Sequence, residues 1–336
     1  GMPAVRIAAI LVAVLLFSPL HATPLFDDAA VIDATLAGPL AELMGDTDSR
    51  EQLPFLLRAE GTDHAVKVRL RGKSRLRVCD FLPMRLNFRK GAVDGTLFEG
   101  QDKLKLVVPC HTSDRAEKNL IEEYAVYRMF NLTTPASYRV RLLRITFRDA
   151  GRNDDDIRMH AFLIEPAEQL AERLGGQESE LPEVALGWLD ADHMALVYVF
   201  QYLVSNVDWS LVRPDEEKAC CHNGTLVETD ATILYIPYDF DLSGFVDAPY
   251  AFPPPDLRID SVTQRRYRGF CTERDALKKA LDMVVPKTQD IAALLESLPV
   301  LSDKNKRRRM SYLDQFFRAA ENEDTLLKRF ENRCLD

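Results

Sequence analysis

The sequence predicts an α+β protein of two lobes, the first rich in strands and the second mainly helical. In residues 61–176 strand-like alternation dominates, and Val66, Val68 and Leu70 share one face of a single run. In residues 177–336 a polar linker, which ends at residue 185, precedes a segment that is apolar nearly all round, and the remainder ends in stretches with helical spacing. Segregated lobes of this kind leave a cleft between them, where ligand sites are commonly built.

The composition is that of an ordinary folded protein. The 336 residues are 46% hydrophobic and 28% charged, which is enough for a large core. The net charge of -9 argues against bulk nucleic-acid binding, so no nucleic-acid partner is expected. The one strongly basic run, residues 304–309, is expected to be a solvated helix face.

Residues 1–22 have the pattern of an export signal. Arg6 precedes an uninterrupted apolar run, residues 7–17, and Ala22 is suited to be the last residue before cleavage. The run is shorter than the roughly 20 residues that span a bilayer. We therefore expect a cleaved signal peptide, no stable membrane span afterwards, and a periplasmic or extracellular location. Residues 23–60 look helical and irregular, an N-terminal extension before the first lobe.

Export permits disulfides, and the chain has six cysteines. Cys79 and Cys110 both occur in strand-like contexts, so they are candidates for a bridge between neighbouring strands. Cys271 is expected to pair with Cys220 or Cys221, although sequence alone does not fix the connectivity. A zinc site is the rival interpretation, which the lack of any CxxC pair disfavours.

The first lobe is predicted to be a series of strands with one long helix. "HAVKVRLRG" places Lys67, Arg69 and Arg71 on its charged face, and "PMRLNFRK" and "DKLKLVV" follow as strands. Residues 114–131 have helical spacing, with Asp114 as the candidate cap. Two further strands, "SYRVRLLRITFRD" and "RMHAFLIE", and a short helix complete the lobe.

The second lobe is predicted to begin with a buried helix, "ADHMALVYVFQYLVSN", which leads directly to Asp208. A loop then reaches Asn223, and a strand-like run ends in Asp239 and Asp241. Three helices are expected to finish the chain, within residues 273–284, 287–298 and 303–332.

Residue types suited to binding phosphate occur in the first lobe. A turn with Gly72, Lys73 and Ser74 can cover phosphates, although an ordinary hairpin turn is the plainer interpretation. Lys105, or its neighbour Lys103, can hold phosphate oxygens if a helix glutamate fixes its position. The glutamate on the apolar stripe of the predicted helix is Glu123, with Glu122 as the adjacent rival.

The second lobe supplies the acids that phosphoryl transfer needs. Asp208 can accept the proton of an attacking hydroxyl, and oxygens of Asn223 and Asp239 can hold magnesium. Asp239 and Asp241 alternate along a strand and so point to opposite faces, which favours one metal ligand and one structural acid unless the backbone turns. The plainer interpretation of both acids is a turn. His222 is expected to pack or to form hydrogen bonds rather than to bind a ligand.

Several segments resemble the CotH-like branch of the protein-kinase-like superfamily. "VKVRLRGKSR" is similar to its strand and "RGNSS"-like turn, "LKL" to its lysine strand, and "HAFLIEPAEQLAERLG" to its "GLYLLVE" strand and helix. "SNVDWS" resembles its "NTDR" segment, and "PYDFDLSG" its "YDFD" metal segment. The resemblance covers about residues 62–275. It is nearest to an uncharacterised group of exported bacterial proteins with the pattern "NTDWS…HN…PYDFDFSG".

This resemblance implies a protein-kinase-like two-lobe fold that binds ATP, or another nucleotide, and Mg²⁺ between the lobes. It makes Lys105 the nucleotide lysine, Glu123 its helix partner and Asp208 the catalytic aspartate. The implied metal ligands are Asn223, Asp239 and, as a second acid, Asp241. The chain departs from the family pattern in its long loop between Asp208 and Asn223 and in having no full glycine-rich loop. It also has Asn-Val-Asp in place of His-Arg-Asp.

Three functions follow as hypotheses. The first is an exported kinase-like protein that binds a nucleotide and Mg²⁺ and transfers phosphate to a protein or small-molecule acceptor. Little ATP exists outside the cytoplasm, which favours as second hypothesis a catalytically inactive binding module of the cell envelope. The third is a metal-dependent hydrolase that uses Asp208, Asp239 and Asp241.

Overall fold

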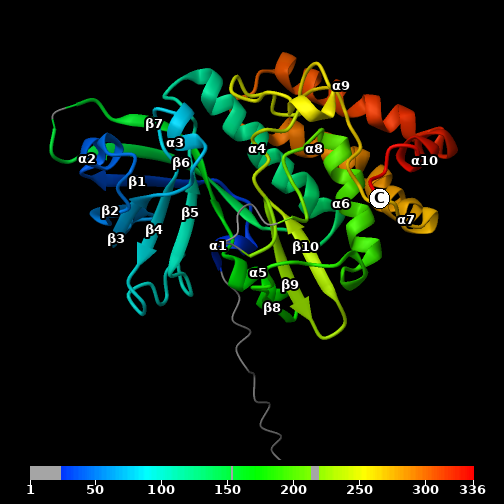
Figure 1. The fold of residues 1–336 in the computed structure, drawn as a ribbon. Coiled ribbons are helices and arrows are strands. Elements are labelled where there is room, and N and C mark those ends of the chain that lie inside the picture. Colours follow the sequence, from blue (N-terminus) through cyan, green and yellow to red (C-terminus); the bar gives the residue numbers. More distant parts are fainter. Residues whose placement is uncertain (1–23, 153, 213–218) are drawn as a thin grey trace, which may run out of the picture.

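The computed structural model describes residues 24–336 except 153 and 213–218. The expected signal peptide, residues 1–22, therefore lies outside the described residues. Figure 1 shows a barrel of strands on one side of the molecule, helices α6–α10 on the other, and α4 between them.

The barrel is closed by seven strands in the order β1-β2-β3-β4-β5-β7-β6. Neighbouring strands are antiparallel except for β1 and β6, which run parallel. The inward side chains of these strands form an apolar core of their own. The strands are Ile32–Gly38 (β1), Leu53–Ala59 (β2), Thr62–Leu70 (β3), Met84–Phe88 (β4), Lys103–Val107 (β5), Val140–Asp149 (β6) and Ile157–Ile164 (β7).

The prediction of a protein-kinase-like two-lobe fold with a helical C-lobe is wrong. Seven strands close into a mixed barrel, and the second half of the chain also contributes to a three-stranded sheet of order β10-β9-β8. Residues 24–60 are also not merely helical and irregular, because they supply β1 and β2. The barrel closes through the pairing of β1 with β6, in which Ile32 lies opposite Leu143. A contact between segments so distant in sequence leaves no local pattern to read.

Helix α4, Asp114–Thr133, confirms the helix predicted at residues 114–131. Its cap is Ser113 rather than Asp114, because the Ser113 side chain accepts a hydrogen bond from the Ala116 N–H. The helix packs against β6 and β7 of the barrel and against α8 of the helical region. It is therefore the element shared by the two halves of the molecule.

The second half is organised around α6, Ala191–Val204, which is buried from His193 to Val204 and so confirms the predicted buried helix. The small sheet is formed by Gly176–Glu178 (β8), Gly224–Thr229 (β9) and Ile233–Pro237 (β10). The longer helices after the small sheet are Arg274–Val284 (α7), Thr288–Ser297 (α8), Asp303–Ala320 (α9) and Glu323–Glu331 (α10). The final helix that was predicted within residues 303–332 is thus divided into α9 and α10.

Short helices connect these elements. The α-helical ones are Pro24–Asp27 (α1), Leu40–Gly45 (α2), Arg75–Val78 (α3) and Ala167–Arg173 (α5). The 3₁₀ turns are Leu186–Trp188, Pro255–Leu257 and Val285–Lys287. Of these, α3 bears on the site, since it follows the predicted glycine turn directly.

All six cysteines form disulfides. The bond between Cys79 and Cys110 confirms the predicted pairing. The strand context expected for the two residues is wrong, because Cys79 follows helix α3 and Cys110 lies beyond the end of β5. The prediction for Cys271 is wrong, because its partner is Cys334, while Cys220 and Cys221 bond to each other. No thiolate is left for the zinc site that was the rival interpretation. Disulfides are typical of proteins that fold outside the reducing cytoplasm.

In the described part of the chain, no helix has both the length and the apolar character that crossing a bilayer requires.

Arg309 departs from the expectation that residues 304–309 form a solvated helix face. The run lies on α9, but Arg309 is only 7% exposed and forms an ion pair with the fully buried Glu122 of α4. Arg309 also donates a hydrogen bond to the Phe245 carbonyl at 2.7 Å. Burial raises the pKa of Glu122 to about 7, against the opposing charge of Arg309. A buried ionic contact thus connects α4 to the helical region.

Replacing Arg309 by methionine should lower the free energy of unfolding by about 3 kcal/mol, because Glu122 would remain buried without its counter-charge. The double variant Arg309→Met/Glu122→Met should recover most of that loss, since the desolvation cost disappears with both charges. Urea denaturation measures both values. Arg308→Met, on an exposed position of α9, is the matched control and should change stability by less than about 0.5 kcal/mol. A double variant no more stable than Arg309→Met would contradict this account.

Candidate functional site

A cleft of 870 Å³ opens where the turn after β3 meets the loop before β9 and the segment after β10. A smaller cavity of 90 Å³ adjoins it on the side of β5 and α4. The two share the turn residues 72–74 together with Tyr238 and Asp239. The barrel and the small sheet thus contribute facing walls to one site.

The structure brings the predicted site residues together. Every predicted residue except Asp241 lines one or both of these cavities. The residues that do so are Gly72, Lys73, Ser74, Lys105, Glu123, Asp208, Asn223 and Asp239. Their predicted roles in binding and catalysis remain predictions.

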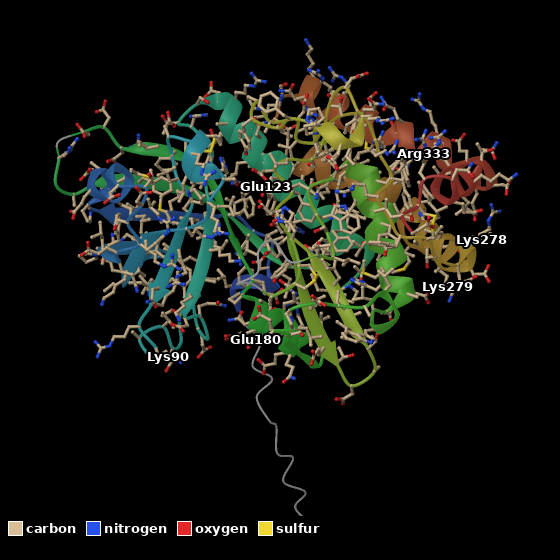
Figure 2. All side chains as sticks on the ribbon, viewed as in Figure 1. Lys90, Glu123, Glu180, Lys278, Lys279 and Arg333 are labelled. Carbon is tan, nitrogen blue, oxygen red and sulfur yellow. A yellow bond between two sulfur atoms is a disulfide. The ribbon has the colours of Figure 1, made fainter. Side chains whose placement is uncertain are left out.

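Arg75 of α3 is the central cation of the site. Its guanidinium lies 2.7 Å from Glu123 Oε2, 3.0 Å from Asp241 Oδ2 and 3.7 Å from Asp239 Oδ1. Tyr250 donates a further hydrogen bond to Asp241 Oδ2 at 2.9 Å. Figure 2 shows Glu123 in the middle of the molecule, between the barrel and the helices. One arginine therefore compensates acids from α4 and from the segment after β10.

This arrangement differs from the prediction in two respects. Glu123 pairs with Arg75, whereas the resemblance implied Lys105 as its partner. Asp239 and Asp241 were expected to point to opposite faces of a strand, yet their carboxylates and that of Glu123 offer oxygens within 4.8 Å of one another. The reason is that β10 ends at Pro237 and Asp239 adopts a left-handed backbone conformation, φ 64°. The turn that this conformation makes brings both acids to Arg75.

The acids around Arg75 differ in their access to solvent. Burial raises the pKa of Glu123 above its usual range against the opposing charge of Arg75. Desolvation and then the charge of Asp241 raise the pKa of Asp239. The Asp239 side chain nevertheless keeps 41% of its surface exposed, while those of Glu123 and Asp241 are nearly covered. Asp239 is therefore the member of this group that a ligand can reach.

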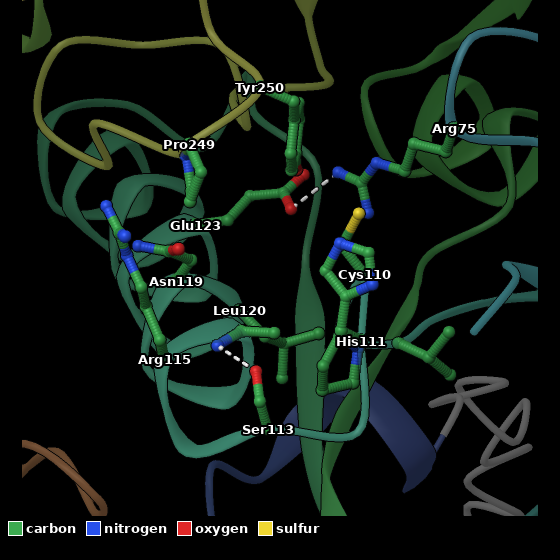
Figure 3. A pocket seen from close by; sticks show the side chains of 13 residues that line it. Arg75, Cys110, His111, Ser113, Arg115, Asn119, Leu120, Glu123, Pro249 and Tyr250 are labelled. Atoms are coloured by element: carbon green, nitrogen blue, oxygen red, sulfur yellow. Dashed lines mark hydrogen bonds and ion pairs between the residues drawn. The ribbon is translucent and has the colours of Figure 1, made fainter. Parts of the chain in front are cut away.

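A third cavity, of 60 Å³, lies on the far side of the Arg75–Glu123 ion pair (Figure 3). It is lined by the N-terminal turns of α4, including Arg115 and Asn119, and by Tyr250. Arg75 and Glu123 line this cavity and the one beside Lys105, so their ion pair is the partition between the two.

Asp208 is held by two side chains from the segment before β9. The imidazole Nε2 of His222 lies 2.9 Å from Asp208 Oδ1, and Asn223 Nδ2 donates to Asp208 Oδ2 at 2.9 Å. The hydrogen bond to Asp208 raises the pKa of His222. Backbone hydrogen bonds between Ser210 and His222 close the loop, so Asp208 and Asn223 touch despite their separation in sequence. His222 forms hydrogen bonds, as expected, but it lines the cleft while doing so.

Besides Lys73 of the turn, which lines both cavities, Arg71 and Lys105 face the site from the barrel. Lys105 of β5 has its Nζ 5.2 Å from the centre of the Tyr238 ring. Burial and then the charge of Arg71 lower the pKa of Lys105 to about 8. Among the described residues, no carboxylate forms an ion pair with either side chain.

Sequence reasoning missed the roles of Arg71 and Arg75. Arg71 was placed on the charged face of its strand, but it follows the end of β3 and lines the cavity beside Lys105. Arg75 ends the segment "VKVRLRGKSR", and its position directly after the glycine turn is the signal that could have found it.

Comparison with known protein families finds no family model that matches the chain, and comparison with the curated proteins finds no match either. The resemblance to the CotH-like family therefore stays a hypothesis, and the chemistry of the site is argued from its own residues.

Lys105 should react with an amine-selective acylating reagent at a lower pH than an ordinary lysine does. Its pKa of about 8 leaves half of the side chains as the nucleophilic free amine at that pH. Peptide mass spectrometry after brief labelling between pH 7 and 10 measures the rate. Lys103, two residues earlier on the same face of β5 and exposed as Lys105 is, serves as the internal control. Equal labelling of Lys103 and Lys105 at pH 8 would contradict the pKa assigned to Lys105.

Replacing Arg75 by methionine should make stability more sensitive to pH. A carboxyl group whose pKa is raised by folding holds its proton longer in the folded state, so stability falls as pH rises through that interval. Removing Arg75 raises these pKa values further and widens the interval. The free energy of unfolding should therefore fall more steeply between pH 5 and pH 8 in Arg75→Met than in the parent protein.

Urea denaturation at both pH values measures this slope. Arg77→Met, exposed on the same short helix, is the matched control and should keep the parent slope. An unchanged slope in Arg75→Met would show that Arg75 does not compensate the three acids.

Proposed function

We propose that the cleft binds a nucleotide together with Mg²⁺, and that the protein transfers a phosphoryl group from it to the hydroxyl of a protein or small-molecule acceptor. One observation carries the proposal. A single continuous wall bears a cation without an ion-pair partner among the described residues, Lys105, and a solvent-accessible carboxylate, Asp239. Phosphates need the first kind of group and a divalent cation needs the second.

The donor set of the cleft fits Mg²⁺. Among the described residues, the Asp239 carboxylate makes an ion-pair contact only with Arg75, at 3.7 Å, and it stays accessible. Asn223 donates through Nδ2 to Asp208, which leaves its amide oxygen for a cation. Asp241 fits less well, because its Oδ2 already accepts hydrogen bonds from Arg75 and Tyr250. Asp239 and Asn223 are thus the residues that would hold Mg²⁺, which when bound offsets phosphate charge.

The remaining residues supply binding and proton transfer. Lys105 attracts the phosphate oxygens, and the turn at residues 72–74 covers them. Asp208 is oriented by the hydrogen bonds that it forms with His222 and Asn223. The acceptor oxygen forms a bond to phosphorus, the bridging P–O bond of the nucleotide breaks, and the acceptor proton passes to Asp208.

The proposal includes export of the mature protein to a periplasmic or extracellular site. The three disulfides support it, since such bonds persist in oxidising compartments. The signal-like pattern of residues 1–22 supports it independently. The nucleotide would then have to be supplied outside the cytoplasm.

Mg·ATP at about 100 times its dissociation constant should raise the free energy of unfolding by about 2.7 kcal/mol. Asp239→Asn should lose the Mg²⁺-dependent part of this gain, because it removes the charged metal ligand. Asp208→Asn should keep binding but lose phosphate release or transfer from γ-labelled ATP. Thermal unfolding and label transfer measure these effects. Asp230→Asn, exposed in the turn between β9 and β10, is the control for both. No stabilisation by any nucleotide with any divalent cation would refute the proposal.

A further inference from the structure

We propose that Arg71 and Lys105 form a two-cation subsite for a chain of adjacent phosphate groups, and that this subsite binds such an anion even without a metal ion. Arg71 thereby becomes a ligand-binding residue. The inference deepens the proposed function and rests on it only for the identity of the natural ligand, a nucleoside di- or triphosphate.

The backbone holds both cations at the same cavity. Arg71 follows the end of β3, and its N–H donates to the Pro83 carbonyl at 3.0 Å. The next residue, Gly72, has φ 86°, a conformation that glycine adopts readily. Lys105 is on β5, which β4 separates from β3, and both side chains line the 90 Å³ cavity. The positions are therefore fixed by the sheet and by the turn rather than by the two side chains themselves.

Neither cation has an acidic partner that would explain its position. Within the described residues, no hydrogen bond or ion pair reaches the Arg71 guanidinium or the Lys105 ammonium group. Asp239 and Glu178 act on Lys105, and Asp239 and Glu123 act on Arg71, only as more distant charges. Two further cations line this cavity: Lys73 of the turn, and Arg75, which is already committed to Glu123 and Asp241. Two like charges facing one small cavity cost free energy, which a bound anion would recover.

The direction of the pKa shifts supports this interpretation. Burial lowers the pKa of Arg71, and burial together with the Arg71 charge lowers that of Lys105. A residue strongly perturbed by desolvation and by a like charge in a cleft is a candidate for a functional site.

The geometry favours adjacent phosphate groups over a single phosphate. Strands β3 and β5 are two strand spacings apart, roughly 9.6 Å between backbones. A guanidinium binds two oxygens of one phosphate group side by side, whereas an ammonium acts as a point charge. A diphosphate or triphosphate can present one phosphate to Arg71 and the next to Lys105. The adjoining 870 Å³ cleft leaves space for the rest of such a ligand.

Calorimetric titration of the full chain with inorganic tripolyphosphate, in the presence of EDTA, tests the subsite. The parent protein should bind it, and orthophosphate should bind about tenfold more weakly or worse. Arg71→Met and Lys105→Met should each weaken tripolyphosphate binding by about tenfold or more, as expected for loss of a charged hydrogen bond. Lys103→Met, on the same face of β5, should bind as the parent does.

The variants must also be shown to fold. Burial lowers the pKa of Arg71 in spite of the attraction by Asp239, so the folded protein disfavours this charge. Arg71→Met should therefore unfold at or above the temperature of the parent protein when no anion is present. A lower unfolding temperature would contradict this net cost of the buried charge. Arg71→Lys should retain more affinity than Arg71→Met, since it keeps the charge.

Three outcomes would overturn the inference. They are absence of tripolyphosphate binding in EDTA, equal affinity for orthophosphate, and equal loss in Lys103→Met and Lys105→Met. Each of these leaves the proposed function open, because stabilisation by Mg·ATP is measured separately and depends on Asp239. Conversely, tripolyphosphate binding without any nucleotide effect would support the subsite and refute the proposed function.

Discussion

The ion pairs of Arg75 with Glu123 and Asp241 are the contact on which the rest of the site depends. They join three segments that are far apart in sequence: the turn after β3, helix α4 and the segment after β10. The disulfide between Cys79 and Cys110 anchors the end of α3, the helix that carries Arg75, close to the end of β5. Without a central cation, three carboxyl groups this close could not all stay ionised at neutral pH, because their mutual repulsion in a poorly solvated site would be too large.

Helix α4 extends this contact to the far side of the molecule. Glu123 turns towards Arg75 and the barrel, while the preceding residue, Glu122, pairs with Arg309 of α9. Two consecutive glutamates on one helix are thus committed to opposite halves of the fold. The helix is held between the two cores by charge as well as by apolar packing. The barrel wall of the cleft is thereby fixed relative to the opposite wall.

The charged groups that the ion pairs of Arg75 leave uncompensated determine the chemistry of the cleft. Arg75 neutralises the two covered acids and leaves Asp239 accessible. On the barrel side Arg71 and Lys105 form no ion pair among the described residues, and Asp239 acts on both only as a more distant charge. Across from them, His222 and Asn223 orient Asp208. Groups of both signs that face one cavity without pairing with each other are suited to a ligand that itself carries both signs, such as a phosphate ester with a divalent cation.

Sequence patterns predicted the local elements well and the long-range closure poorly. The periodicity of α4 and α6 was sufficient to predict these helices, because it depends on neighbouring residues. The pairing of Cys79 with Cys110 was predicted correctly from a strand context that is wrong, since Cys79 follows helix α3. The parallel pairing of β1 with β6, and hence the barrel, joins segments more than 100 residues apart and has no local signature.

The site was predicted as a set of residues but not as a set of contacts. The residues at the cleft could be chosen by type and order, since phosphate and metal chemistry restricts both. The convergence of Asp239 and Asp241 depends on one left-handed residue, and strand alternation predicts the opposite. The pairing of Glu123 with Arg75 instead of Lys105 depends on how α3 follows the turn. Secondary-structure propensity does not specify this geometry.

The central claim is that metal and phosphate meet between the barrel wall and the Asp239 wall of one cleft. Anomalous scattering from Mn²⁺ in crystals grown with a non-hydrolysable ATP analogue tests it most directly. The account predicts one manganese peak beside the side-chain oxygens of Asp239 and Asn223, with phosphate density against Arg71 and Lys105 and with Arg75 still paired to Glu123. A metal that displaces Arg75 from Glu123 and Asp241, or phosphate density bound away from Arg71 and Lys105, would contradict it.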